Sequence, residues 1–378
     1  MKKIRIMVLY GGRPGEHEIS LRSAASVIRF LDSSRFDVIP VAIDKQGKWL
    51  LNDVSLIKKS ADSLPVFHDA PAVVLPPHPG SVEDGLIRLG STCSGDLAQS
   101  SGIDVVFPVM HGPLCEDGTI QGLLELADIP YVGCGVLASA VGMDKDVAKR
   151  LMKEAGMPIV PYIALKKNNW EEGQPSLALK VEQELSFPVF VKPANLGSSV
   201  GVYKVKTAEA LDSAIKSAFQ FDTKILIEKA VQAREIELAV LEDSQPGKPP
   251  LVSIPGEIVP THEFYSYEAK YLDEDGAKLL IPAKLNSEKI TVARKIARQA
   301  FEVLECEGMA RVDLFLDKDS DHFFFNEINT IPGFTSISMY PKMWEHSGIS
   351  YQELLSRLVD LAISRHQRKK SLVRNYQQ

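Results

Sequence analysis

Residues 4–12 read IRIMVLYGG, and residues 20–31 read SLRSAASVIRFL. The first segment is a short apolar run that ends at two glycines, which is typical of a buried strand followed by a tight turn. The second repeats apolar residues at helical spacing, so the pair predicts a strand, a glycine turn and a helix. Residues 38–43 and 105–110 are further β-branched runs closed by polar, Gly or Pro residues. Together they predict parallel strands of an α/β unit.

The composition is that of an ordinary globular protein long enough for two or three domains, with 378 residues of which 45% are hydrophobic and 24% charged. The formal net charge of -6 gives no basic footprint for nucleic acid, so we expect no nucleic-acid partner. No apolar run approaches the roughly 18 residues that a membrane span needs. The two glycines also cut the N-terminal run too short for a signal peptide, and the 4 cysteines show no CxxC spacing. We therefore expect a cytoplasmic protein with reduced thiols.

The rest of the chain divides by pattern into further elements. Residues 52–102 are irregular and predict a surface insertion, in which a small hairpin would escape notice. Helices are predicted at 119–126, 136–156 and 288–304, and a final helix opens with the capping box Ser350-x-x-Glu353. Strands are predicted at 189–192, 202–205, 225–229, 235–241, 311–317 and 323–328. The polar and aromatic segment 262–281 resembles a mobile loop, and new units are expected to begin near residues 137 and 232.

The strongest chemical cluster is Asp313 with Glu327 and Asn329. Residues two apart on a strand share a face, so Glu327 lies beside Asn329 and Arg311 beside Asp313. Two carboxylates and an amide oxygen suit magnesium or manganese. A polar strand face with a simple surface contact between Arg311 and Asp313 explains the same pattern, and spacing alone leaves both interpretations open.

A second cluster is Lys192 followed by the Gly/Ser segment of residues 195–201. Small residues let backbone N–H groups approach phosphate oxygens, and a lysine adds a positive charge. A plain hairpin turn is an equally good explanation. The segment lacks the Gly-Lys-Ser/Thr ending of a Walker A loop. The glycines at 11, 12 and 15 likewise lack the dinucleotide fingerprint, and Glu16 stands where a pyrophosphate would be repelled.

Two weaker signals remain. His111 and Gly112, with Glu116 and Asp117, follow a predicted strand at the end where α/β sheets bind small ligands, although a lone histidine is often structural. The strand end at Glu228, with Glu235 seven residues later, could bind adenine and ribose, but that pattern has little specificity.

Taken in order, several segments resemble the D-alanine:D-alanine ligases, and the match runs nearly end to end. The segments are 11–21 (GGRPGEHEISL), His111-Gly112, Met143-Asp144-Lys145, 192–201, Glu268-Ala269-Lys270-Tyr271, Arg311-Val312-Asp313 and 327–335 (EINTIPGFT). The resemblance implies an N-terminal doubly wound parallel sheet domain followed by a two-subdomain ATP-grasp fold. We place the domains at 1–136, 137–231 and 232–378, the last carrying the metal site and a lid.

The resemblance also implies an ATP-dependent ligase that phosphorylates the carboxylate of one D-alanine and lets the amine of a second attack, for peptidoglycan biosynthesis. It implies two Mg²⁺ or Mn²⁺ ions on Asp313, Glu327 and Asn329. The implied nucleotide-binding residues are Lys145, Lys192, Ser198, Glu228, Lys229, Val231 and Glu235, the two lysines holding phosphates. The implied catalytic and substrate residues are Glu16, His111, Ser199, Lys270, Tyr271, Arg311, Gly333 and Ser338. Among these, Arg311 and the Gly333 N–H would stabilise the tetrahedral intermediate.

One departure concerns Cys115, which stands where the family commonly has glycine, so the turn after His111 must accommodate a side chain or follow another path. Tyr271 agrees with dipeptide-forming members. A D-alanine:D-lactate ligase, an L-amino-acid ligase and a nucleotide-binding regulatory module are the alternatives. The last is disfavoured because the metal ligands and Arg311 are all present. We further expect a homodimer.

Overall fold

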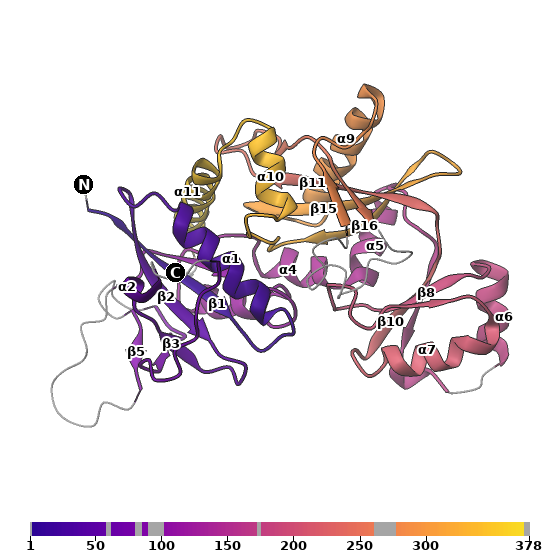
Figure 1. Cartoon of the computed structure of the whole chain (residues 1–378), viewed down its shortest axis with the longest axis horizontal. Coiled ribbons are helices and arrows are strands. Elements are labelled where there is room, and N and C mark those ends of the chain that lie inside the picture. The colour runs from indigo at the N-terminus through magenta and orange to yellow at the C-terminus, as the bar shows by residue number, and fades with distance from the viewer. Residues whose placement is uncertain are drawn as a thin grey trace.

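The structure is a computed structural model that describes residues 2–57, 62–79, 85–89, 102–171, 175–260 and 277–373. Within these residues the strands form two four-stranded sheets, one six-stranded sheet and one two-stranded pair. The first sheet, the second sheet and the six-stranded sheet occupy separate regions of the molecule (Figure 1). The chain is an α/β protein, as predicted.

The first sheet has the order β3-β2-β1-β6. Its strands are β1 (Ile4–Gly11), β2 (Phe36–Ile43), β3 (Trp49–Leu51) and β6 (Val105–Val109). β1 pairs in parallel with both β2 and β6, which confirms the predicted parallel unit, and β3 adds an antiparallel edge strand.

Both faces of the first sheet are covered by helices. Successive side chains of β1 point to opposite sides and so pack in two different cores. Ile6 and Val8 pack in one core with α1 (His17–Phe30) and α11 (Tyr351–Lys370). Met7 and Leu9 pack in another core with α3 (Thr119–Leu126). The apolar run at the start of the sequence is therefore buried from Ile6 onward.

The predicted insertion at 52–102 contains the short helix α2 (Val54–Ile57) and an antiparallel pair, β4 (Val73–Val74) with β5 (Ile87–Arg88). Its other described residues form no further helix or strand. Residues 58–61, 80–84 and 90–101 lie outside the described residues.

The second sheet is antiparallel throughout, with the order β7-β10-β8-β9. Its strands are β7 (Tyr162–Lys166), β8 (Val189–Pro193), β9 (Tyr203–Val205) and β10 (Lys224–Lys229). Helices α6 (Pro175–Glu184) and α7 (Leu211–Ala218) supply Val181, Leu211 and Ile215 to its core. The sequence patterns predicted β8, β9 and β10 but not β7, α6 or α7.

The single helix predicted at 136–156 is wrong in one respect, because it is two helices, α4 (Val136–Met143) and α5 (Lys145–Glu154). Asp144 between them is extended, and its side chain accepts a 3.0 Å hydrogen bond from the Val147 N–H. Asp144 thus serves as the N-cap of α5, and a cap of this kind favours starting a new helix. Lys145 becomes the first residue of α5.

The six-stranded sheet has the order β14-β13-β11-β15-β16, with β12 also paired to β11. Its strands are β11 (Ala233–Leu241), β12 (Leu251–Val252), β13 (Gly256–Pro260), β14 (Ala277–Leu280), β15 (Met309–Asp317) and β16 (Phe323–Asn329). Helices α4, α5 and α9 (Ser287–Val303) share one core with this sheet, and α10 (Met339–His346) shares another. The predicted loop at 262–281 is wrong at its end, because residues 277–280 form β14, while residues 261–276 lie outside the described residues.

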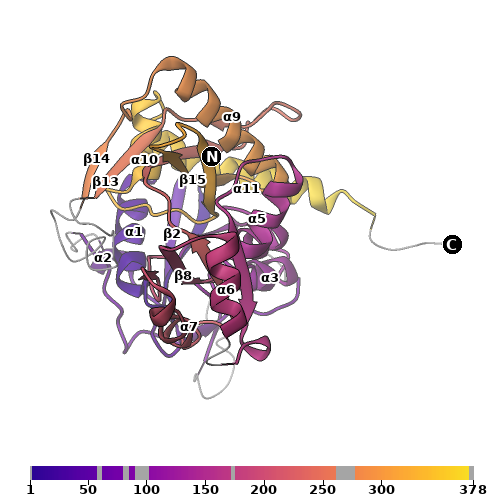
Figure 2. The same ribbon diagram turned by 90° about the vertical axis from the view of Figure 1, so that its right-hand side faces the viewer.

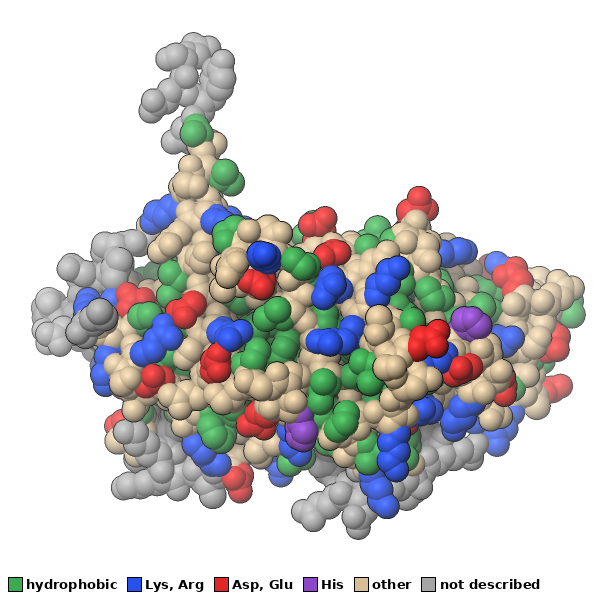
Figure 3. Space-filling model, turned by 90° about the horizontal axis from the view of Figure 1, so that it is seen from above, with side chains coloured by type: hydrophobic (Ala, Val, Ile, Leu, Met, Phe, Trp, Pro, Cys, Tyr) green, Lys and Arg blue, Asp and Glu red, His purple; other side chains and the backbone are tan. Residues whose placement is uncertain are grey.

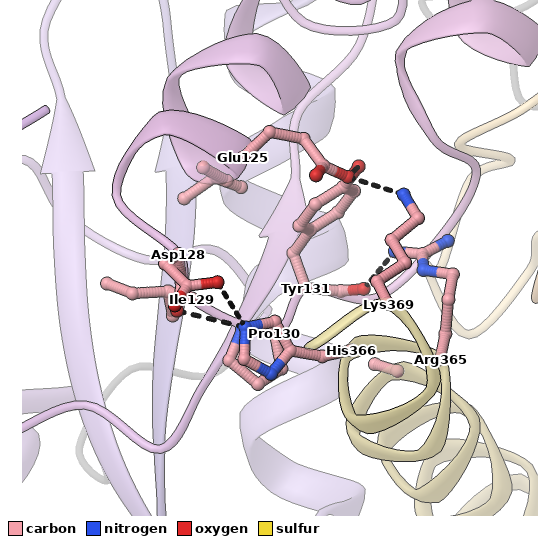
Figure 4. Close-up of a pocket in the computed structure, with 10 residues that line it drawn as sticks. Glu125, Asp128, Ile129, Pro130, Tyr131, Arg365, His366 and Lys369 are labelled. Atoms are coloured by element: carbon pink, nitrogen blue, oxygen red, sulfur yellow. Dashed lines mark hydrogen bonds and ion pairs between the residues drawn. The ribbon is translucent and has the colours of Figure 1, made fainter. Parts of the chain in front are cut away.

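The last helix, α11, returns to the first sheet and lies beside α1 (Figures 1 and 2). Its cap is the predicted one, since the Ser350 side chain accepts from the Glu353 N–H at 3.3 Å. Figure 4 shows polar contacts that fix its far end, where Lys369 binds Glu125 at 2.7 Å and His366 contacts Asp128 at 3.0 Å. The pocket between these side chains has a volume of about 10 Å³, enough for about one water molecule.

On the face seen in Figure 3, Lys and Arg side chains are interspersed with Asp and Glu side chains. Among the residues that the structure describes, no helix is both long enough and apolar enough to cross a bilayer. The three described cysteines, Cys115, Cys134 and Cys306, are free and buried. The domain boundaries at 137 and 232 stay a prediction.

Candidate active site

The candidate site lies on β15 and β16, where the predicted cluster is in register. Asp313 is directly opposite Glu327, and Arg311 is directly opposite Asn329. Residues opposite each other in an antiparallel pair share a face, so all four side chains lie on the same side of the sheet. The grouping expected from the sequence is therefore present.

The contact between Arg311 and Asp313 exists, but it is not a simple surface contact. Arg311 Nε and Nη2 donate to the two Asp313 oxygens at 2.7 and 2.6 Å, and the Asn329 amide donates to Asp313 at 2.9 Å. Arg311 Nε also lies 3.2 Å from an oxygen of Glu237 on β11. Burial opposes the charged form of Arg311, yet the Asp313 and Glu237 charges raise its pKa well above the usual value. Arg311 is thus a fixed cation within reach of several carboxylates.

The donor set fits a hard divalent cation with few protein ligands. Asp313, Glu327 and Asn329 offer carboxylate and amide oxygens from neighbouring strands, which is the chemistry that magnesium and manganese prefer. Within the described ranges, no three Asp, Glu, His or Cys side chains form a metal site by themselves. A cation here would accordingly share its coordination with water or phosphate oxygens.

Lys145 joins this cluster to the Gly/Ser loop. Its Nζ lies 3.2 Å from a Glu327 oxygen and donates to the Leu196 carbonyl at 2.6 Å. Its backbone N–H also donates to the Ala194 carbonyl at 3.0 Å. The start of α5 is therefore fixed against both groups of residues that the sequence singled out separately.

Lys192 at the root of the loop belongs to a buried ion-pair network. Its Nζ lies 2.6 Å from one oxygen of Glu228, and Lys149 on α5 lies 2.8 Å from the other. Burial would raise the pKa of Glu228, but the two lysines lower it below the usual value, so this carboxylate is ionised. Both oxygens of Glu228 are paired with lysines. The contact with adenine that the sequence suggested for this strand end would therefore be made by its backbone.

The loop between Lys192 and β9 is a hairpin connection, since β8 and β9 are antiparallel neighbours. Ser198 and Ser199 both have positive φ, 54° and 59°. Asn195 is anchored by Asp222, which accepts from its backbone N–H at 2.8 Å and from its amide at 3.0 Å. The hairpin interpretation is correct as topology, and it is compatible with a phosphate-binding role.

His111 is buried and bridges two loops. Its Nδ1 donates to the Ile331 carbonyl at 3.1 Å, and its Nε2 lies 3.3 Å from the Ser23 hydroxyl. Ser23 in turn accepts from the Phe334 N–H at 3.3 Å. Burial lowers the pKa of His111 to about 4, so the imidazole is neutral at neutral pH.

Two carboxylates flank the His111 loop. Glu116 accepts from the Gly112 N–H at 2.6 Å, and burial raises its pKa to about 8. Glu16 is buried between two glycines, because a Cβ built on Gly112 would lie 2.5 Å from Glu16 Oε2 and one on Gly197 would lie 3.4 Å from Oε1. The first sheet and the Gly/Ser loop thus meet at Glu16.

Gly333 lies beside Ser338, since a Cβ at Gly333 would be 2.8 Å from the Ser338 hydroxyl. That hydroxyl accepts from the Thr335 N–H at 3.0 Å and contacts the Thr335 hydroxyl at 2.7 Å. The structure therefore brings these two predicted residues together on the loop that follows β16.

The turn around Cys115 does not strain the cysteine. Leu114, with φ 68°, takes the left-handed position, and the Cys115 N–H donates to the Gly112 carbonyl at 3.1 Å. The departure noted from the sequence is accommodated by the residue before it.

The remaining predicted residues divide into two groups. Lys229, Val231 and Glu235 lie at the end of β10, in the link to β11 and on β11. Lys270 and Tyr271 lie outside the described residues.

Sequence reasoning missed Lys149, Glu237 and Ser23. Lys149 and Glu237 are a buried cation and a buried anion paired with predicted site residues. Glu237 could have been found, since it shares a strand face with Glu235 by the same two-residue period. Lys149 sits one helical turn after Lys145, which is a weak signal by itself.

Two family models match this chain. The model described as the D-ala D-ala ligase N-terminus covers residues 5–134, and the model described as the D-ala D-ala ligase C-terminus covers residues 151–360.

Full-length relatives agree with these models. A D-alanine-D-alanine ligase A from Bradyrhizobium diazoefficiens is 56% identical over 377 residues, covering 99% of both chains. A D-alanine-D-alanine ligase from Oceanobacillus iheyensis is 48% identical and covers 98% of both chains.

Solved structures are also similar. The D-alanine-D-alanine ligase from Coxiella burnetii has a TM-score of 0.81 at 35% identity, covering 98% of this chain and 97% of that one. The VanG D-Ala:D-Ser ligase from Enterococcus faecalis has a TM-score of 0.79 at 33% identity, covering 96% of this chain and 100% of that one.

Proposed function

Because this chain belongs to the D-alanine-D-alanine ligase family and has that enzyme's activity in peptidoglycan precursor synthesis, we propose how its own residues divide the work. The observation that carries the proposal is the register of Asp313 with Glu327, with Arg311 beside them and Lys145 reaching from Glu327 to the Gly/Ser loop. This arrangement places oxygen donors, two cations and a backbone loop together, which phosphoryl transfer requires.

ATP is bound between the second sheet and the six-stranded sheet. Lys145 and Lys192 hold its phosphates, with Ser198 and the loop N–H groups beside them. The adenosine part is bound by Glu228, Lys229, Val231 and Glu235, with the backbone at Glu228 contacting adenine. The Lys192–Glu228 ion pair of 2.6 Å supports this division, because it fixes the lysine at the loop before any phosphate arrives.

Asp313, Glu327 and Asn329 would hold two Mg²⁺ or Mn²⁺ ions. Such ions would supply positive charge that neutralises phosphate charge and aligns the transferring group. The hard oxygen donors on adjacent strands support this assignment.

The first D-alanine is anchored through its ammonium group by Glu16, whose carboxylate lies between the His111 loop and the Gly/Ser loop. Ser199 and Tyr271 link it to the lid, and His111, Lys270 and Ser338 complete the pocket, Ser338 binding the carboxylate of the second alanine. Because the imidazole of His111 is neutral, we assign it the role of a hydrogen-bonding side chain that lines the substrate pocket and carries no charge.

The proposed reaction has two steps. A carboxylate oxygen of the first alanine bonds to the γ-phosphorus of ATP as the bond to the ADP oxygen breaks. The neutral amine of the second alanine then bonds to the acyl carbon and loses a proton, and phosphate leaves. Attack of the amine gives a tetrahedral intermediate, which lasts until phosphate leaves. Arg311 and the Gly333 N–H stabilise the negative charge on its oxygen.

The test is to incubate the enzyme with ATP, Mg²⁺ and, in separate reactions, D-alanine, D-serine, D-lactate with D-alanine, or L-amino acids, and to weigh the products. D-alanyl-D-alanine as the main product supports the proposal. Ester or mixed dipeptides as the main product would assign the chain to another ligase specificity. The cytoplasmic location and the homodimer belong to this proposal, and sedimentation of the purified protein tests the homodimer.

A further inference from the structure

Glu237 is the third carboxylate in a row that crosses the six-stranded sheet. β11 pairs Glu237 directly with Asp313, and β16 pairs Asp313 directly with Glu327, so the three side chains share one face. The next row on that face contains Arg311 and Asn329. Glu237 is thus separated from Glu327 by one strand and lies on the far side of Asp313.

The Arg311 guanidinium contacts two carboxylates of this row, Asp313 and Glu237. It is bidentate to Asp313, at 2.7 and 2.6 Å, and its Nε is also 3.2 Å from Glu237. The Glu237 side chain is only 7% exposed, against 24% for Glu327. Glu237 therefore faces Arg311 from the protected side of the site.

The oxygens of Asp313 have two roles. It accepts from Arg311 and from the Asn329 amide, and in the proposed function it also binds a divalent cation. A carboxylate that coordinates Mg²⁺ has fewer lone pairs left for a guanidinium. A buried arginine must then keep another anion, since an unpaired buried charge is costly.

We propose that Glu237 is a positioning residue that holds the Arg311 guanidinium toward the developing oxyanion when the oxygens of Asp313 are used for metal. This inference rests on the proposed function, in which Arg311 stabilises the tetrahedral intermediate. Glu237 acts through Arg311 and touches neither substrate nor cation.

The experiment compares Glu237→Gln and Glu237→Leu with a matched control, Glu257→Gln. Glu257 is also buried on this sheet and ion-paired with an arginine, Arg234, at 2.7 Å, but it pairs across from Ile236 and so lies on the opposite face. The expected kcat falls about tenfold for Gln and about a hundredfold for Leu, because the ion pair with Arg311 is weakened or lost. The KM for ATP stays within about twofold in both variants, and Glu257→Gln keeps the parent kcat.

A second readout separates positioning from metal binding. Mn²⁺ titrated by electron paramagnetic resonance, with a non-hydrolysable ATP analogue present, should bind the Glu237 variants as it binds the parent. A phosphinate dipeptide analogue of the tetrahedral intermediate should bind them more weakly by the same factor as the loss in kcat. Weakened Mn²⁺ binding, or an unchanged kcat in folded variants, would overturn the inference.

The variant Arg311→Lys distinguishes this inference from the proposed function. If Arg311→Lys leaves kcat unchanged, the proposed role of Arg311 is wrong. If Arg311→Lys lowers kcat while Glu237→Gln does not, only the role of Glu237 is wrong. The double variant is expected to lose no more than Arg311→Lys alone, because Glu237 acts through that arginine.

Discussion

Lys149 and Glu228 form an ion pair of 2.8 Å in which the lysine side chain has no exposed surface. Glu228 also binds Lys192, so a residue of α5 is coupled through one carboxylate to the lysine at the root of the Gly/Ser loop. Removing Lys149 would leave a buried carboxylate with a single cation. The pair therefore links the stability of the fold to the position of a proposed phosphate-binding residue.

Lys149→Met is expected to lower the free energy of unfolding by about 1–3 kcal/mol, because the buried Glu228 carboxylate loses one of its two cations and keeps only Lys192. Urea denaturation measures the change. Lys153→Met, at an exposed position of the same helix, should change it by less than about 0.5 kcal/mol. Equal urea midpoints for the Lys149 variant and the parent would refute the prediction.

Glu327→Gln is expected to lower ligation at least about a hundredfold while the melting temperature stays unchanged, because the charge that binds the cation is lost. Product formation and Mn²⁺ affinity are measured on the same preparation. Glu302→Gln, on the exposed face of α9, is the control. Near-normal turnover by a folded, metal-saturated Glu327→Gln enzyme would remove Glu327 from the metal site.

Stability is expected to fall as the pH drops from about 6.5 to about 4 because of His111, whose pKa is lowered from 6.5 to about 4 by burial. The unfolded state binds the extra proton in that window, so His111 stabilises the fold fully above 6.5 and loses that contribution toward pH 4. The slope is about 1.4 kcal/mol per pH unit at most. Denaturation at several pH values should show a shallower slope for His111→Asn, and parallel profiles would contradict the assignment.

Amide product is expected to rise from mildly acidic to mildly alkaline pH, because only the unprotonated amine of the second alanine attacks. The hydroxyl of D-lactate needs no such deprotonation, so ester formation does not rise with pH for this reason. D-lactate also leaves unpaired the groups of the site that bind an ammonium. Mixed reactions with D-alanine and excess D-lactate, analysed across this range, measure the ratio. Ester in excess at neutral pH would place the enzyme among depsipeptide-forming ligases.

The buried strands could be predicted from the sequence because their apolar runs are short and are closed by polar, Gly or Pro residues. The cluster of Asp313 and Glu327 could be predicted because the two-residue period of a strand requires no knowledge of the rest of the fold. The two neighbouring strands were both predicted, and the structure adds their register, with Asp313 opposite Glu327. What the sequence left open was whether these residues hold a metal ion or only form a polar strand face with a surface contact between Arg311 and Asp313.

Other features depend on contacts between distant segments. The break at Asp144 depends on one side-chain cap inside an otherwise helical pattern. Glu237 and Lys149 gain their importance only when β11 and α5 are packed beside β15 and β10. β7 is a mixed polar and apolar edge strand, and its pattern lacks the apolar run that marked β8 and β10.

The first strand of this protein is covered by its last helix. Ile6 and Val8 on β1 share a core with Leu354 and Leu358 on α11, and Arg365 near the end of that helix donates to the Tyr131 carbonyl at 2.7 Å. During synthesis β1 leaves the ribosome long before α11 is made, so the face of the first sheet that carries Ile6 and Val8 lacks part of its cover until α11 follows. Apolar surface exposed for that interval is a target for chaperones and for aggregation. The N-terminal core is therefore completed only when α11, a segment distant in sequence, packs onto β1.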